Sequence, residues 1–364
     1  MGTNMIRREA IKKILEAGVQ APSGSNSQPW QFHFEGNDTV AVRMLPELDH
    51  PVLNVRAWGT LFATGALLEN ILIAAAYEGW KISIVLFPKA DDRNLVARIS
   101  FIAEHEANAD GGTKELYEAI FKRATNRKPY GMEKIDGVIR ERLLAAPSEA
   151  GIYDIALKLV DDRGQIETVA RAVSVNELVM FRNKRLHELF MQELVWTEAE
   201  EHERQSGLYL KTMELKPQQE RALKLFRSWK TLNIMNKLVG AARMIASDNA
   251  KVYAACSFYG AILCGTEDVD IVHAGQVTER AWLAATAMGL SFHLQTGVNF
   301  LAARLETPEG GKIFTVQEAE LIRGAYETVR NIFQAGDRFV PVVFRIGRGG
   351  EPSARSSRKP PIMV

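Results

Sequence analysis

The chain has 364 residues, 46% of them hydrophobic and 24% charged, proportions typical of a soluble globular protein with a sizeable core. Its formal net charge of +1 argues against a nucleic-acid or anionic-membrane partner. Two isolated cysteines, Cys256 and Cys264, predict neither a disulfide nor a zinc site and fit a reducing compartment.

The first expected element is a helix with apolar positions at Ile11, Ile14 and Leu15, and the residues before it lack the apolar core of a signal peptide. It runs into a polar turn over residues 21–30, Ala-Pro-Ser-Gly-Ser-Asn-Ser-Gln-Pro-Trp, and then into an alternating strand over 31–34. Such a loop offers exposed backbone N–H groups and small polar side chains. It can therefore follow a flat polar heterocycle closely, or it can be an ordinary connection between a helix and a strand.

Residues 65–80 form the next expected helix, and the same pattern recurs over residues 275–290. Aligned without a gap at an offset of 210, the two segments share glycines at both ends, a glutamate and a pair of alanines. Each reads as a helix with small residues on one face, ended by a glycine suited to a left-handed position. The apolar part of the first copy is interrupted by Glu69 and Asn70 and is too short to span a bilayer. We therefore expect a cytoplasmic protein without a membrane partner.

A second echo pairs Ala-Pro-Ser at residues 21–23 with Ala-Pro-Ser at 146–148, each at the end of a helical pattern, at an offset of 125. The two offsets differ by 85, so the second copy should contain about that many extra residues. A charged, helix-prone stretch that has no counterpart earlier in the chain can supply them. We therefore expect two copies of one unit, 1–118 and 119–364, the second with a helical insertion at about 182–243.

The second unit opens with two guanidinium groups and a hydroxyl at alternating positions, Arg123, Thr125 and Arg127. Alternate residues of an extended chain share a face, and arginine makes charge-assisted, often bidentate bonds to phosphate. By itself the spacing fits either a phosphate site or a solvated basic loop. Later in the chain, residues 289–297 follow the second copy of the apolar helix, and a strand at 341–344 leads into a basic tail.

Together these motifs resemble the FMN-dependent nitroreductase family. Residues 21–32, Ala-Pro-Ser-x-x-Asn-Ser-Gln-Pro-Trp-x-Phe, are similar to its signature loop, which one subunit of a dimer packs on the isoalloxazine held mainly by the other. Residues 123–127 resemble the family's Arg-x-Ser-x-Arg/Lys box, and 289–297 its Gly-Leu-x-x-x-Pro-x-x-Gly segment beside flavin N5. One chain with twin units and a single complete site resembles the long-chain, Acg-like branch of the superfamily.

The resemblance implies an FMN site with no catalytic side chain and no metal ligand. Its cofactor-binding residues are Pro22, Ser23, Gly24, Asn26, Gln28, Arg123, Thr125, Arg127, Gln295, Thr296, Gly297, Arg355 and Arg358. The 22–28 group would line the flavin ring, and the backbone of residues 295–297 would lie beside N5. Leu294 stands at the family's usual proline and Thr296 where bacterial members often have Glu, so an acid function at that position is lost.

The same resemblance distributes the basic residues along the cofactor. Arg123 and Thr125 would hold the phosphate or the ribityl chain, and Arg358, with Arg355 as the alternate, would close on the phosphate. Arg127 would lie nearer the N1/O2 edge, where positive charge stabilises the reduced flavin.

The implied fold is α+β, with two pseudo-symmetric halves, each a mixed sheet flanked by helices, plus a lid-like helical insertion. We expect an oxidoreductase in which NAD(P)H reduces flavin N5 and the flavin reduces a nitroaromatic, quinone or similar conjugated acceptor. The alternative is a non-catalytic FMN storage or sequestration protein with a lid over the flavin. Since the second half replaces the usual partner subunit, either a monomer or a homodimer is consistent with the sequence.

Several residues outside these motifs have two readings. His187 and His202 lie on the charged insertion and are expected to be solvated, whereas His293 is expected to be structural or to face substrate. Four apolar residues of the insertion could form the underside of a lid or pack ordinarily: Trp196, Tyr209, Met213 and Trp229.

Overall fold

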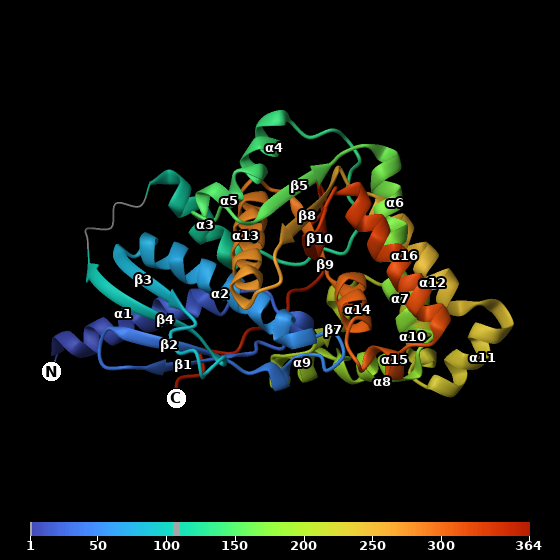
Figure 1. Cartoon of the computed structure of the whole chain (residues 1–364), viewed down its shortest axis with the longest axis horizontal. Helices are drawn as coiled ribbons and strands as arrows, with labels where there is room; N and C mark the ends of the chain where they lie inside the picture. The colour runs from blue at the N-terminus through green and yellow to red at the C-terminus, as the bar shows by residue number, and fades with distance from the viewer. Residues whose placement is uncertain (1, 105–109) are drawn as a thin grey trace.

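Two four-stranded sheets flanked by helices make up the computed structural model, which describes residues 2–104 and 110–364 (Figure 1). The first sheet has the order β1–β2–β4–β3, from β1 (Trp30–Phe34), β2 (Thr39–Met44), β4 (Leu95–Glu104) and β3 (Trp80–Leu86). The second has the order β5–β8–β10–β9, from β5 (Ala156–Val160), β8 (Phe258–Cys264), β10 (Phe339–Gly347) and β9 (Ser291–Gln295). The expected α+β class is confirmed.

The two sheets have the same topology. Taken in chain order, β1, β2, β3 and β4 correspond to β5, β8, β9 and β10, and the strand order in space is then identical. In each half a long apolar helix precedes the third strand: α2 (Trp58–Tyr77) before β3, and α13 (Asp268–Ala287) before β9.

The expectation of mixed sheets needs a correction. Every pairing between the named strands of the two four-stranded sheets is antiparallel. Parallel pairing at these sheets is limited, within the described residues, to single bridges from Phe32 to Met363 and from Thr125 to Phe292. Each bridge brings a short segment from elsewhere in the chain to a sheet edge, and the segments are too short to form strands.

The helices α2 and α13 pack against each other at the centre of the molecule (Figure 1). A Cβ atom on Gly65 would collide with the carbonyl oxygen of Val272, and one on Gly275 would collide with that of Phe62. The close approach therefore requires glycine at both positions. By length and composition the helical stretch Val55–Tyr77 could cross a membrane, yet 83% of its most apolar window is buried inside the protein.

The helices between β5 and β8 extend beyond the expected insertion at both ends. They are α6 (Arg163–Val173), α7 (Val175–Met180), α8 (Lys184–Glu193), α9 (Glu198–Arg204), α10 (Pro217–Phe226), α11 (Trp229–Val239) and α12 (Ala241–Ala254). The short strands β6 (Leu194–Val195) and β7 (Leu208–Tyr209) and the 3-10 turn η4 (Leu210–Met213) lie among them. In the first half a four-residue turn joins the corresponding strands, β1 and β2.

The inserted helices have a hydrophobic cluster of their own, which includes Phe181, Phe190 and Leu232. His187 belongs inside it: the residue is 1% exposed and its Nε2 lies 2.8 Å from the Phe226 carbonyl oxygen. The expectation of a solvated His187 is therefore wrong, because the charges around it on α8 face outward while the ring faces the cluster. The other side chains expected on a lid, at Trp196, Tyr209, Met213 and Trp229, are buried or partly buried.

The remaining helices complete both halves. They are α1 (Gly2–Gly18), α3 (Gly111–Lys122), α4 (Gly137–Leu144), α5 (Ala146–Glu149), α14 (Gly297–Leu305), α15 (Gly310–Ile313), α16 (Val316–Ile332), η1 (Gly24–Asn26), η2 (Pro46–Leu48) and η3 (Val55–Ala57). The expected boundary after residue 118 falls inside α3. Beyond β10, the chain crosses back to the first sheet, where Phe32 donates its N–H to Ile362 and accepts that of Val364, both at 2.9 Å.

Candidate functional site

A cavity of about 1040 Å³ lies where both halves, the insertion and the C-terminal segment meet. Most of the residues predicted to bind the cofactor line it: Pro22, Ser23, Asn26, Arg123, Thr125, Arg127, Gln295, Thr296, Gly297, Arg355 and Arg358. Gly24 and Gln28 face elsewhere, Gly24 toward Asp49 and Gln28 toward the C-terminal segment. The volume is at the upper end of the range for small-molecule sites.

The loop between α1 and β1 reaches the cavity through an unusual backbone. Ser25, Asn26 and Gln28 have positive φ angles of 44°, 57° and 52°, a region that residues other than glycine seldom occupy. The side chain of Ser23 supports the turn, because its Oγ accepts the Gln28 N–H at 2.9 Å. Strain of this kind persists only where the surroundings hold it, and it is common at ligand sites.

The C-terminal segment and the insertion hold this loop. Arg358 donates to Asn26 Oδ1 at 2.7 Å, and Asn26 Nδ2 donates to the carbonyl of Ser357 at 3.0 Å. Gln28 accepts the Lys359 N–H at 2.8 Å and donates to the carbonyl of Gln205 at 2.6 Å. The amides of Asn26 and Gln28 are therefore already engaged by protein groups.

Arg123 and Arg127 do not converge on one point, contrary to the simplest reading of their spacing. Arg123 is buried, with Nε 3.1 Å from Glu279 Oε1 on α13 and its guanidinium over the ring of Trp282. Arg127 turns to the insertion and donates to the carbonyl of Thr212 at 2.9 Å. Burial lowers the pKa of both guanidinium groups.

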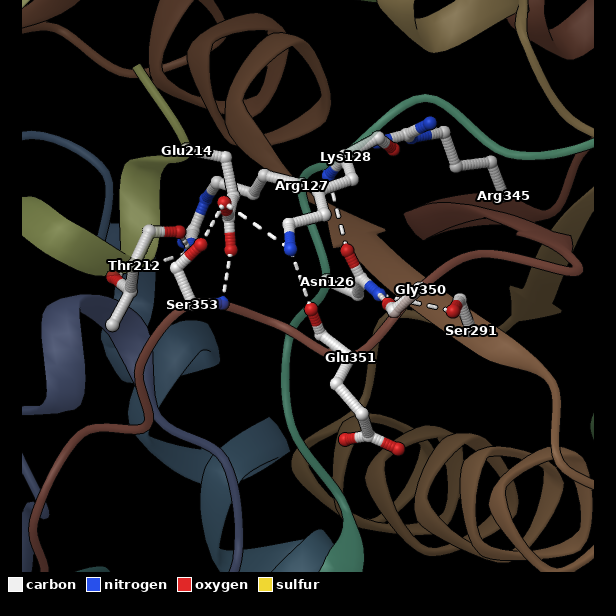
Figure 2. Close-up of polar contacts among 10 residues, drawn as sticks. All are labelled: Asn126, Arg127, Lys128, Thr212, Glu214, Ser291, Arg345, Gly350, Glu351 and Ser353. Atoms are coloured by element: carbon white, nitrogen blue, oxygen red, sulfur yellow. Dashed lines mark hydrogen bonds and ion pairs between the residues drawn. The ribbon is translucent and has the colours of Figure 1, made fainter. Parts of the chain in front are cut away.

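Figure 2 shows how the segment around Arg127 is anchored. Between the arginines, Asn126 is buried and donates to Ser291 Oγ at 3.0 Å and to the carbonyl of Gly350 at 2.6 Å. Lys128 donates to the carbonyl of Glu351 at 2.6 Å. These contacts join the segment to β9 and to the chain that leaves β10, so the position of Arg127 is set from both sides.

A buried group of positive charges lies at one end of the cavity. Burial and the nearby charge of Arg123 lower the pKa of Arg358 to about 9, although the carboxyl groups of Glu279 and Glu201 oppose the shift. Within the described part of the chain, Arg358 Nε has no hydrogen-bond partner, and the contact of Arg123 Nε is its ion pair with Glu279. Arg355 lies near Arg123 as well but is more exposed. An anion bound here would offset the mutual repulsion of these groups.

The segment after β9 forms another wall of the cavity. Gly297 begins α14, and a Cβ atom at this position would collide with the side-chain amide of Asn176 on α7. The first-turn N–H groups of a helix lack helical partners, so this end of α14 favours negative charge. Gln295 accepts the hydroxyl of Tyr259 at 2.7 Å.

Several lining residues come from the insertion and were not expected from the sequence. Glu177 of α7 accepts the Tyr253 hydroxyl at 3.0 Å, and burial raises the pKa of its carboxyl group to about 7. Thr212 and Glu214 also line the cavity. A single polar residue on a helix resembles any solvated residue in sequence, so no local signal could have identified them.

His293, which was expected to be structural or to face substrate, is buried, and one of its ring nitrogens has a hydrogen-bond partner. Its Nδ1 accepts from Arg345 Nε at 3.1 Å, and its ring stacks edge-on to that of Tyr253. Arg345 is fully buried and donates also to the carbonyls of Lys128 and Val252. Burial and the charges of Arg345 and Arg127 hold the pKa of His293 well below its usual range.

Comparison with known proteins relates the chain to nitroreductases. Residues 2–49, which contain the loop after α1, match the model of the nitroreductase family. The chain is 24% identical to the Mycobacterium tuberculosis protein MT1398 (strain CDC 1551 / Oshkosh) over 80% of its own length and 39% of the relative. It is 27% identical over 55% of its length, and 57% of the relative, to the M. tuberculosis protein acg, named as a proposed NAD(P)H nitroreductase. The chain thus covers less than two thirds of either relative.

Among solved structures, the FMN-dependent nitroreductase NfnB from Mycobacterium smegmatis in complex with NADPH matches 68% of this chain and 94% of its own, at 14% identity and a TM-score of 0.37. The family match covers the loop that lines the cavity, and the sequence relatives extend across much of the remaining chain. The loop that lines the cavity thus matches the nitroreductase family, and the chain as a whole is similar to long, Acg-like relatives of that family.

Proposed function

We propose that the protein is an FMN-dependent oxidoreductase of the nitroreductase type, with one flavin held in the cavity between its halves. NAD(P)H is the reductant, and a nitroaromatic, quinone or similar conjugated molecule is the acceptor. The observation that carries the proposal is the meeting of three segments on one cavity: the loop after α1, residues 123–127 and residues 295–297. Their places along the chain are those of the family motifs that they resemble.

The groups around the cavity suit FMN. The buried cluster of Arg123 and Arg358, with Arg355 beside it, concentrates positive charge at one end of the cavity, and the Nε of Arg358 has no hydrogen-bond partner among the described residues, which fits the phosphate. Thr125 lies on the same wall and can hydrogen-bond the phosphate or the ribityl chain. Pro22 and Ser23 provide a flat, weakly polar surface for the ring. Arg127 and the first turn of α14 provide positive potential for its pyrimidine side.

When bound, FMN supplies two-electron transfer at N5, and the protein supplies position and electrostatics. Arg358 and Arg123 bind the phosphate, and the loop after α1 orients the ring. Arg127 stabilises negative charge that develops on the ring during reduction. The inserted helices narrow access to the cavity and exclude water from it.

We propose that the chain is two copies of one unit, 1–118 and 119–364, that together hold one FMN. At the position related to Glu279 by the repeat, Glu69 of the first half lies 2.6 Å from Arg280, which is also 4.0 Å from Glu149. Among the described residues, Arg280 there pairs with two carboxylates, so this position offers less positive charge to a phosphate than the cluster of Arg123 and Arg358 does. An internally paired chain has no need of a partner subunit, and either a monomer or a homodimer is compatible with the proposal. A reducing, cytoplasmic compartment is consistent with the two free, buried cysteines.

The absorbance spectrum of the purified protein before and after anaerobic addition of NADPH tests the proposal. We expect a yellow protein with one FMN per chain whose visible flavin absorbance bleaches on mixing. A protein that cannot be loaded with FMN contradicts the proposal.

One observation favours a second candidate, storage of FMN without turnover. The insertion bonds directly to the loop and tail around the cavity: Glu193 accepts from Ser25 Oγ at 2.6 Å, and Glu201 accepts from the Ser357 N–H at 2.6 Å. A segment fastened in this way could keep NAD(P)H out. A bound flavin that NADPH does not reduce, and that exchanges slowly into buffer, would favour storage.

A further inference from the structure

His50 and Glu193 form a pair in the cavity wall that the proposed flavin contacts do not use. His50 follows η2 in the first half, and Glu193 ends α8 of the insertion. Both residues line the cavity, with His50 Nε2 and Glu193 Oε1 4.0 Å apart. This separation is too long for a hydrogen bond between them. Their side chains are 10% and 24% exposed, and the cavity is the space that they face.

The far side of each group is already fixed. His50 Nδ1 accepts the N–H groups of Val52 and Leu53, both at 3.1 Å, so this nitrogen carries no proton. Burial lowers the pKa of His50 to about 4, and the ring is therefore neutral near pH 7 with its proton on Nε2. Glu193 Oε2 accepts from Ser25 Oγ at 2.6 Å. What remains toward the cavity is one N–H donor on His50 and one oxygen, Oε1, on Glu193.

We propose that His50 Nε2 and Glu193 Oε1 recognise an amide edge, in which a ligand carbonyl accepts from His50 and the adjacent ligand N–H donates to Glu193. A donor beside an acceptor matches a group that presents the reverse pair, and a fully satisfied pair is favoured in a partly dehydrated cavity. The source of the amide rests on the proposed function. It is either the carboxamide of NAD(P)H or the pyrimidine ring of FMN, and both present a carbonyl next to an N–H.

The pair should be sensitive to pH. Burial raises the pKa of Glu193 to about 7, the Ser25 hydroxyl opposes this, and the carboxyl group of Asp49 adds to it. On the other member of the pair, the charge of Arg304 lowers the pKa of His50. Below pH 7 the proton on Glu193 occupies the free oxygen and blocks the ligand N–H. Amide binding should therefore strengthen as the pH rises through about 7 and then level off.

Two substitutions test the pair, with a control on the same helix. Glu193→Ala removes the acceptor. Glu193→Gln keeps its size and can still offer an oxygen, but it does not titrate. Glu188→Ala is the control, because Glu188 is exposed and pairs with Lys184 at 3.6 Å. The dissociation constant of FMN is measured by fluorescence titration of flavin-free protein, and that of NADP⁺ by the difference spectrum of the holoprotein, both from pH 6 to 8.5.

We expect Glu193→Ala to weaken one of these two ligands by about tenfold or more at pH 8, the loss of one hydrogen bond to a charged acceptor. Glu193→Gln should bind that ligand without the pH dependence of the wild type. A loss for FMN that is absent with N3-methyl-FMN identifies the pyrimidine ring as the source. A loss confined to NADP⁺ identifies the carboxamide.

The outcomes separate this inference from the proposed function. If the wild type binds FMN and both Glu193 variants match Glu188→Ala for each ligand, the amide subsite is wrong and the proposed function stands. If the wild type binds no FMN, the proposed function fails and the subsite fails with it.

Discussion

Gly65 of α2 and Gly275 of α13 face each other where the two helices cross. A methyl group on either glycine would overlap backbone atoms of the partner helix. The group that a Cβ on Gly65 would meet is the Val272 carbonyl, and for Gly275 it is the Phe62 carbonyl. Val272 and Phe62 are separated by the same 210 positions as the two glycines. The crossing is therefore symmetric, and it places the two halves so that segments of both reach one cavity.

Gly65→Ala is expected to destabilise the protein by about 1–3 kcal/mol, because the added methyl group meets backbone atoms that cannot rotate away. Urea unfolding measures the effect. Gly324→Ala is the matched control, since Gly324 is exposed within α16 and a Cβ there meets nothing within 4 Å. It should stabilise the protein by about 0.5–1 kcal/mol through helix propensity. Equal effects at both sites would contradict the close crossing.

Arg123→Met should destabilise the protein by about 3–5 kcal/mol, since it leaves the buried carboxyl group of Glu279 without its partner. Adding Glu279→Gln should restore part of this loss, and a double-mutant cycle in urea gives the coupling. The surface pair Arg142–Glu115, 2.7 Å apart, is the control. Arg142→Met should change stability by less than about 1 kcal/mol. No recovery in the double variant would mean that the Arg123 stem, not its charge, is what stabilises the site.

Arg358→Ala should weaken FMN binding by about tenfold or more, because it removes a buried cation from the proposed phosphate site. Arg355→Ala should have a smaller effect, since the Arg355 side chain is 44% exposed and its charge is screened by solvent. Fluorescence titration of the flavin-free variants compares them. Riboflavin lacks the phosphate, so Arg358→Ala should weaken the binding of riboflavin much less than it weakens the binding of FMN. The opposite ranking would assign the phosphate contact to Arg355.

Glu177→Gln should raise stability at high pH and change it little at low pH. Burial raises the folded-state pKa of Glu177 to about 7, above its ordinary value of 4.5. A raised carboxyl pKa contributes stability that is fully present below pH 4.5 and is lost as the pH rises through 7. Removing the titrating group should therefore recover up to about 3 kcal/mol above pH 8. Unfolding by urea at pH 5 and pH 8.5 measures the difference, and an advantage at pH 5 would contradict it.

The sequence was most informative where the physical requirement is local. The offset between Gly65 and Gly275 anticipated two helices of like pattern, and strand alternation at residues 31–34 matched β1. The segment that contains Arg123, Thr125 and Arg127 was also recognisable, because alternation and side-chain chemistry are both readable from a short run of residues. All three side chains line the cavity.

The sequence did not predict contacts between distant segments. The pairing of Arg123 with Glu279, the burial of His187 and the extent of the inserted helices each depend on packing across more than one element. The sheets were expected to be mixed, but their strands pair only in the antiparallel sense. The parallel contacts at their edges are single bridges to short segments from elsewhere in the chain.

The sequence by itself determined the resemblance to nitroreductases, the α+β class and the segments that surround the cavity, since each is encoded in contiguous motifs and in their spacing. Only the tertiary structure decided which side chains within those segments are free. Asn26 and Gln28 are held by the C-terminal segment, whereas His50 and Glu193, which carry no motif, each keep one polar atom toward the cavity. Whether a polar group is satisfied depends on atoms far away in the chain, and folding brings those atoms within reach.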